Sequence, residues 1–204
     1  MQARHDPGSS PKRTFTETAR RAQIVEAAIA TIAEVGYRGA SFTQIAKRAG
    51  LSSTGLISYH FAGKDELIEE VVADIVGAIG RFMAGRLQAV PGARAALRAY
   101  IEGNVEFTGA HRREMKALVD IFMNGGFHYD TATEEAVVSP VEDILRAGQQ
   151  AGEFRRFDPK VMATLVQRAV DGLPFLLAGD PDLDVSLYAA EVAAAFDLAT
   201  RAER

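Results

Sequence analysis

The sequence predicts an all-α protein, with a small N-terminal helical domain over 15–63 and a larger helical body over 64–204. Apolar residues recur at helical spacing, and no stretch of useful length alternates polar and apolar residues as a half-buried strand does. Glycine and proline break the chain from Lys64 onward at Pro91-Gly92, Gly125-Gly126, Asp158-Pro159 and Asp180-Pro181. The helices expected between these breaks span 64–88, 92–109, 112–124, 134–151, 159–178 and 184–202.

The first helix of the N-terminal domain has a local signal at each end. Thr14 and Glu17 have the spacing of a capping box, in which side chains satisfy free backbone amides, so the helix should start near Phe15. Gly36 should end it after Val35, because glycine adopts the left-handed conformation without steric cost. Its inward stripe is Ile24, Ala28, Ile32 and Val35.

Two short helices joined by a tight turn follow. Ser41 and Gln44 form a second capping-box pair, so the first short helix should begin near Phe42. Gly50 can end that helix in the left-handed conformation, and the chain then turns through Leu51.

The second short helix should carry small hydroxyls and one phenol on its outward side. Ser52 or Ser53 can cap it. Its expected packing residues are Leu56, Ile57, His60 and Phe61, and its expected outward residues are Thr54, Gly55, Ser58 and Tyr59. Hydroxyls bond to phosphates and base edges, and a glycine lets the backbone approach a duplex closely.

This order of parts is the layout of a helix-turn-helix that docks on DNA. Lys64 adds a cation at the start of the next helix. The predicted DNA-binding residues are Ser41, Thr43, Ser52, Ser53, Thr54, Gly55, Ser58, Tyr59, His60 and Lys64. In the alternative interpretation, the Ser and Thr hydroxyls are simple caps, and Tyr59 and His60 are a half-buried packing pair.

The recognition helix lacks Arg, Asn and Gln, the side chains whose bidentate contacts identify a guanine or an adenine. Readout is therefore expected to use thymine methyls, hydroxyls and DNA shape. Substitution of Ser53, Thr54 or Ser58 should alter the sequence preference.

The charge distribution favours a DNA-binding head, although the net charge of −4 does not. Residues 1–64 hold nine Lys and Arg against four Asp and Glu, whereas the remaining residues hold fourteen against twenty-three. A basic head attracts phosphates and an acidic body is repelled, which orients the molecule and makes its affinity salt-dependent. Uneven surface solvation is the alternative explanation.

The first fourteen residues, MQARHDPGSSPKRT, are rich in Pro, Gly, Ser and charge and show no apolar period. We therefore expect a disordered basic arm over 1–14. Lys12 and Arg13, with Arg20 and Arg21 at the start of the first helix, could reach phosphates or a minor groove. A solubilising tail is the alternative.

Residues 16–70 resemble the N-terminal DNA-binding domain of the TetR family of transcriptional regulators. The resemblance rests on the long first helix ARRAQIVEAAIATIAEVGYRGAS, the TQIAKRAGLS segment, the aromatic ending SYHF and the lysine with acidic neighbours in AGKDEL. Between Gly50 and Phe61 the chain carries one more residue than the commonest family pattern, which leaves the start of the recognition helix open. The resemblance implies a regulator that binds an operator in double-stranded DNA.

The last two long helices are rich in small and apolar residues, which let helices approach closely. In the TetR family the corresponding helices form a four-helix interface between two subunits, so the resemblance implies a homodimer on a palindromic operator. The predicted interface residues are Leu173, Leu176, Leu177, Tyr188, Val192 and Phe196. The alternative is that these residues fill a monomer core.

Aromatic residues and methionines gather between the head and these two helices, where they could line an apolar cavity for a small-molecule effector. The predicted ligand-binding residues, with sparse polar anchors among them, are Phe82, Met83, Asn104, Phe107, Met115, Phe122, Met123, Gln167, Asp171 and Phe175. Any helical core also requires such aromatics, so the pocket is implied mainly by the resemblance. Pro140 should kink its helix or start it.

The mechanism implied by the resemblance couples effector to operator. The helix that starts near Lys64 touches the head at one end and the expected pocket along its length, so an effector that tilts it changes the separation of the two heads. Recognition helices in successive major grooves stand roughly 34 to 36 Å apart. A repressor released by a small apolar or amphipathic effector is the leading prediction, and an activator or a corepressor-type regulator is the alternative.

Other classes of protein find little support in the sequence. It contains no cysteine and no N-terminal secretion signal, so we expect a cytoplasmic protein. Apolar runs such as LPFLLAG are shorter than the roughly 20 residues of a membrane span. The four histidines are scattered without an HExxH or nucleophile motif, so we expect no metal, no cofactor and no enzymatic activity. An enzyme and a helical scaffold without specific DNA binding remain as minor alternatives.

Overall fold

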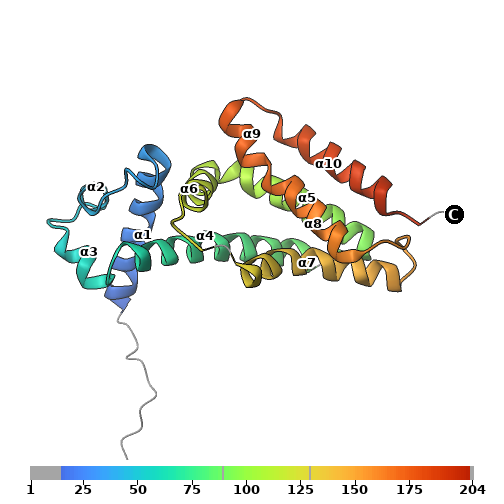
Figure 1. The fold of residues 1–204 in the computed structure, drawn as a ribbon, viewed down its shortest axis with the longest axis horizontal. Coiled ribbons are helices and arrows are strands. Elements are labelled where there is room, and N and C mark those ends of the chain that lie inside the picture. The colour runs from blue at the N-terminus through green and yellow to red at the C-terminus, as the bar shows by residue number, and fades with distance from the viewer. Residues whose placement is uncertain (1–14, 89, 129, 203–204) are drawn as a thin grey trace, which may run out of the picture.

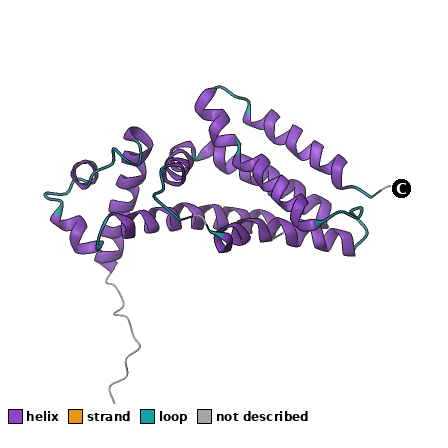
Figure 2. Ribbon diagram, in the orientation of Figure 1, coloured by secondary structure: helices purple, strands orange, loops and turns teal. Residues whose placement is uncertain are grey.

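The computed structural model describes residues 15–88, 90–128 and 130–202, and in these ranges the chain consists of helices joined by loops (Figures 1 and 2). The predicted all-α fold class is confirmed. Across the same ranges the extended pairing amounts to one isolated antiparallel bridge, between Phe154 and Arg201. The predicted basic arm over 1–14 lies outside the described residues.

The head lies at one end of the molecule (Figure 1). Its helices are α1 (Phe15–Val35), α2 (Phe42–Arg48) and α3 (Gly55–His60). Helix α1 starts where the sequence predicts, and Gly36 and Gly50 have left-handed φ angles of 79° and 64°. The capping box at the start of α2 is also present, with Ser41 and Gln44 each accepting a bond from the backbone N–H of the other.

Helix α3 begins at Gly55, later than a cap at Ser52 or Ser53 would start it. Thr54 is its N-cap residue and no side chain caps it, so the prediction that Ser52 or Ser53 caps this helix is wrong. Leu56 also differs from its prediction, because it is 38% exposed and does not pack inward. A helix of six residues has too few turns for an apolar period to separate inward from outward positions.

The body contains seven helices in the described residues. They are α4 (Lys64–Leu87), α5 (Ala93–Ala110), α6 (Arg112–Met123), α7 (Thr131–Gln150), α8 (Pro159–Asp171), α9 (Leu173–Gly179) and α10 (Val185–Thr200). Asp158 and Asp184 cap α8 and α10, where their carboxylates accept the backbone N–H groups of Val161 and Leu187.

Two prolines affect their helices differently. The helix predicted over 159–178 is divided at Gly172 into α8 and α9, because Pro174 lacks a backbone N–H and its ring crowds the carbonyl four residues earlier. Pro140, in contrast, lies inside α7, which continues through it, so the predicted possibility of a helix start at this residue is excluded.

Two hydrophobic clusters hold the fold together, and α4 contributes to both. The head cluster combines α1, α2 and α3 with the N-terminal half of α4, from Leu67 to Ile75, and with Leu118 and Ile121 of α6. The body cluster joins α5, α7, α8, α9 and α10, and it includes Met83 from the C-terminal half of α4. Figure 1 shows α4 running from the head along the body. Helix α4 therefore links the two clusters mechanically. Helix α6 packs with the head, although its residues lie beyond the domain boundary predicted after residue 63.

One described stretch, Pro159–Gly179, is long and apolar enough to cross a membrane, with 33% of its most apolar window buried. Length and composition alone are weak evidence for a membrane span. Gly172 interrupts this stretch, and Gln167, Arg168 and Asp171 within it form polar contacts with one another. The stretch therefore does not indicate a membrane protein.

Candidate functional site

Helix α3 presents a polar surface to solvent. Ile57 and Phe61 are buried in the head cluster and fix the inward side of this segment. On the other side Tyr59 is 74% exposed, and its ring meets that of His60 edge to face at 5.0 Å. The remaining predicted DNA contacts of this segment are half-buried Thr54 and exposed Ser52, Ser53, Gly55 and Ser58. The fold thus brings the predicted residues of the recognition helix to one accessible surface.

Ser41 and Thr43 lie at the exposed start of α2. The Ser41 hydroxyl donates to Gln44 Oε1 at 3.0 Å and accepts the Gln44 N–H at 3.4 Å. The hydroxyl of Ser41 is therefore used to hold the helix start. Thr43, one residue into the helix, stays a predicted DNA contact.

Lys64 is held against Tyr37, which lies in the turn after α1. Its Nζ donates to the Tyr37 carbonyl at 2.8 Å and lies 4.3 Å from the centre of the Tyr37 ring. The Tyr37 N–H donates to the carboxylate of Asp120 on α6. The ring packs so closely on Gly126 that an added Cβ would lie 2.6 Å from it. Tyr37 therefore joins the head to α4 and α6 and sets the position of the Lys64 ammonium.

Arg21 joins α1 to the ends of α3 and α4. Its side chain is buried, and its guanidinium lies 4.0 Å from the centre of the Phe61 ring. It pairs with Glu70 at 2.7 Å and with Glu66 at 3.3 Å, and it donates to the backbone carbonyl of His60. We call this group of contacts the Arg21 clasp.

The suggested phosphate contact of Arg21 is therefore wrong. The sequence did contain a signal, because Arg21 precedes Ile24 and Ala28 by three and seven residues and so lies on the inward stripe of α1. Its neighbour Arg20 donates to Gln23 at the surface, at 2.7 Å. The positions of these two residues around the helix therefore bury Arg21 and leave Arg20 at the surface.

The apolar residues predicted to bind a ligand divide between different parts of the fold. Phe82 of α4 and Phe107 of α5 meet edge to face with ring centres 5.6 Å apart, and Met83 is buried in the body cluster. Met115 and Phe122 of α6 pack instead against the head cluster. The predicted ligand residues are divided in this way because α6 folds back onto α1.

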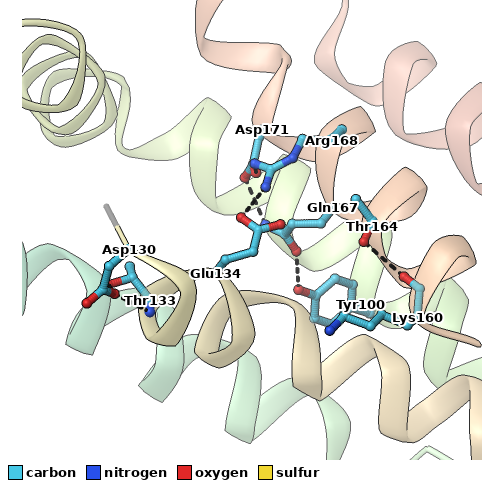
Figure 3. A network of polar contacts seen from close by, with 9 residues as sticks. All are labelled: Tyr100, Asp130, Thr133, Glu134, Lys160, Thr164, Gln167, Arg168 and Asp171. Carbon is cyan, nitrogen blue, oxygen red and sulfur yellow. Dashed lines mark hydrogen bonds and ion pairs between the residues drawn. The ribbon is translucent and has the colours of Figure 1, made fainter. Parts of the chain in front are cut away.

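Gln167 and Asp171, two predicted polar anchors, belong to a network that links α5, α7 and α8 (Figure 3). The Tyr100 phenol donates to Gln167 Oε1 at 2.6 Å, and the Gln167 amide donates to Asp171 at 2.8 Å. Arg168 bonds the other oxygen of Asp171 at 3.0 Å and also pairs with Glu134 of α7. The carboxylates of Glu134 and Asp171 thus share the Arg168 guanidinium.

Burial alters the acidity of two members of this network. Desolvation raises the pKa of the Tyr100 phenol, and the negative charge of Asp171 raises it further. Desolvation also raises the pKa of Asp171, against the opposing effects of the Gln167 bond and the Arg168 charge. Asn104, a third predicted anchor, donates its amide to the Tyr100 backbone carbonyl at 2.8 Å. The network and the Phe82–Phe107 pair both lie along α5.

Met123 and Phe175 are exposed, so neither lines an enclosed space within the protomer. Two cavities in the described part of the chain lie away from all ten predicted ligand residues. One, of about 440 Å³, lies at the start of α5 beside α10 and is lined by charged residues that include Arg94, Glu153 and Asp197. The other, of about 160 Å³, lies between α1 and α4 next to the Arg21 clasp.

Large apolar side chains are exposed on α8, α9 and α10, a set that we call the outer face. Its residues are Val161, Leu165, Phe175, Leu176, Leu187 and Leu198. Leu173 and Leu177, predicted for the dimer interface, are buried within their own protomer and so do not fit a contact with a second copy. Leu176 is exposed, and the other predicted interface residues are half-buried Tyr188, Val192 and Phe196.

Comparison with known proteins identifies the family. Residues 24–71 match the model for bacterial regulatory proteins of the tetR family. Over 162 residues the chain is 35% identical to the HTH-type transcriptional regulator BetI of Cronobacter sakazakii, a match that covers 78% of this chain and 76% of the relative.

The fold agrees with that of solved structures. A transcriptional regulator of Pseudomonas aeruginosa PAO1 superposes with a TM-score of 0.76 at 25% identity, over 90% of both chains. A regulator of Saccharomonospora viridis in complex with choline gives a TM-score of 0.80 at 22% identity, over 91% of this chain and all of the other. The chain belongs to the tetR family of bacterial regulatory proteins, and it is a DNA-binding transcriptional regulator and not an enzyme.

Proposed function

We propose that the protein is a repressor that binds a palindromic operator as a homodimer and leaves it when a small apolar or amphipathic effector binds the body. The position of α4 carries the proposal. Its N-terminal half packs in the head cluster, and Met83 in its C-terminal half packs in the body cluster. A ligand that repacks the body can therefore tilt the helix on which the head rests.

The head has the charge and the surface that an operator requires. Its excess of Lys and Arg favours contact with phosphates. The exposed hydroxyl of Ser58 and the phenol of Tyr59 can reach base edges and phosphates when α3 enters the major groove. Lys64, held by Tyr37, adds a positive charge at the start of α4.

The outer face supports the homodimer. Its leucine, valine and phenylalanine side chains contact water in a single protomer, and burial against the same surface of a second copy would recover hydrophobic free energy. A twofold dimer presents two copies of α3, which must stand roughly 34 to 36 Å apart to enter successive major grooves. A shift of a few ångströms breaks this fit.

We place the effector along α5, between the Phe82–Phe107 pair and the polar network of Tyr100, Gln167 and Asp171. Such a site would take an amphipathic molecule. The Saccharomonospora viridis regulator was solved with choline, so choline is a first compound to test. By linkage, the effector weakens operator binding by the same factor by which the operator weakens effector binding.

Selection of bound sequences from a random double-stranded DNA pool by the full-length protein tests the proposal. We expect a palindromic motif with half-sites about one helical turn apart. Binding at several salt concentrations without an enriched motif would refute operator recognition. The selected operator then separates the two modes of regulation, because an effector lowers the operator affinity of the proposed repressor and raises that of a corepressor-type regulator.

A further inference from the structure

Leu56 is the one aliphatic side chain that α3 exposes. It is the second residue of the helix, between exposed Gly55 and fully buried Ile57. A single exposed leucine is unremarkable on most protein surfaces. Here, however, it lies on the helix that we propose enters the major groove, beside hydroxyl groups and a phenol.

The packing of the head fixes the direction of Leu56. Ile57 and Phe61 hold the inward side of α3, and Leu56 lies about 100° around the helix from Ile57. The Arg21 guanidinium binds the carbonyl of His60 at the other end of α3. Because both the inward side and the C-terminal end of the helix are held, α3 cannot roll to bury Leu56 without breaking these contacts.

The start of α3 is also uncrowded. A Cβ added at Gly55 would meet only Ser53 Oγ, at 3.5 Å, and the side chain of Thr54 makes no cap. The N-terminal residues of a recognition helix are those that contact base edges. Leu56 thus follows directly after the glycine at which the backbone can approach the duplex most closely.

We propose that Leu56 contacts the C5 methyl of a thymine in each half-site and makes thymine the preferred base at that position. The inference rests on the proposed operator binding. A leucine cannot read the hydrogen-bonding groups of the major groove, and the thymine methyl is the apolar group that the groove presents. At any other base the leucine would displace water that hydrogen-bonds to the polar base edge, and it would offer no hydrogen bond in exchange.

The test uses the full-length protein and its selected operator, in which each thymine in turn is replaced by uracil in both half-sites. The replacement removes the methyl and keeps every hydrogen-bonding group. One replacement should weaken wild-type binding about fourfold per half-site, the equivalent of about 0.8 kcal/mol for one methyl-sized group. In Leu56→Ala the same replacement should change the affinity less than about twofold, because the partner of the methyl is gone.

Val76→Ala, which truncates an exposed apolar residue of α4, is the matched control and should keep the wild-type response to uracil. Equal responses of the wild type and Leu56→Ala at every thymine would overturn the role of Leu56 and leave operator recognition intact. Wild-type binding that no uracil replacement weakens would likewise overturn the role of Leu56 and leave operator recognition intact. A wild type that selects no motif would overturn both proposals.

Discussion

Arg21 Nη2 on α1 lies 2.7 Å from Glu70 Oε2 on α4, next to the end of α3. The same guanidinium donates to the carbonyl of His60, the last residue of α3. Arg21 Nε is buried without a hydrogen-bond partner among the described residues, so the terminal nitrogens make the hydrogen bonds. A movement of α4 therefore reaches the recognition helix through one buried side chain.

Arg21→Met should lower the stability of the head. Methionine keeps much of the volume of arginine but removes the ion pairs and the donor to the His60 carbonyl. Glu66 and Glu70 are more than a third exposed, and water can solvate them once their partner is gone. We therefore expect the free energy of unfolding to fall by about 1–3 kcal/mol, less than for a fully buried pair. Urea unfolding of both proteins measures the difference.

Arg20→Met is the matched control, because Arg20 is adjacent in sequence and donates to Gln23 at the surface. Its unfolding free energy should stay within about 0.5 kcal/mol of the wild type. Equal stabilities of the two variants would show that the clasp adds nothing to the stability of the head.

Lys64→Ala should weaken binding to all DNA sequences by a similar factor. The Tyr37 carbonyl takes one hydrogen of the ammonium, which leaves others for a phosphate. Loss of one phosphate contact reduces the slope of log affinity against log salt by about one. Affinities at four or more salt concentrations give the slope. An unchanged slope in Lys64→Ala would remove Lys64 from the phosphate contacts. Lys116→Ala on α6 is the control and should have the wild-type slope.

Leu176→Asp should convert the proposed dimer to monomers. Leu176 is exposed in the protomer, so the protomer itself should lose little stability. In a twofold interface, however, the substitution buries two unpaired carboxylates. Sedimentation equilibrium at micromolar concentration measures the change. Val76→Asp adds the same charge at an exposed apolar site outside the outer face and should remain dimeric. A Leu176→Asp protein that also remains dimeric would contradict the proposed interface.

Local signals in the sequence predict the helices well. A cap or a left-handed glycine acts within one turn, so Ser41 with Gln44, Asp158 and Gly50 can be assigned from residues next to one another. The break at Gly172 is local too, but the apolar run around Pro174 concealed it. For these reasons the fold class and most helix ends follow from the sequence.

The candidate sites depend on contacts that no local pattern contains. The partners of Arg21 lie 39 to 49 residues away, and Tyr37 bonds Asp120 across 83 residues. Most of the predicted ligand residues lie in one aromatic-rich stretch of the sequence, from Phe82 to Met123, yet α6 carries Met115 and Phe122 to the head cluster because it folds back on α1. Composition can indicate that a body is rich in aromatic residues, whereas the packing of its helices decides which of them meet.

Tyr100→Phe should destabilise the protein by an amount that depends on pH. At pH 8 the variant leaves Gln167 Oε1, a buried acceptor, without its donor, which should cost about 1–3 kcal/mol. The folded pKa of the Tyr100 phenol is raised above its ordinary value of about 10, chiefly by burial. Above about pH 10 the Tyr100 phenol loses its proton in the unfolded chain but keeps it in the folded protein, so the free energy of unfolding of the wild type falls. Tyr100→Phe has no phenol to ionise, so its free energy of unfolding does not fall for this reason.

The difference in unfolding free energy between Tyr100→Phe and the wild type should therefore shrink above pH 10, by up to about 1.4 kcal/mol for each pH unit. Contributions from the other titrating groups cancel in the comparison, because both proteins contain them. Urea unfolding at pH 8.0, 10.0 and 11.0 gives the three differences. Tyr59→Phe removes an exposed phenol and should match the wild type to within about 0.5 kcal/mol at each pH. A difference for Tyr100→Phe that stays constant from pH 8 to 11 would mean that the Tyr100 phenol ionises as readily in the folded protein as in the unfolded chain, contrary to its burial against Gln167.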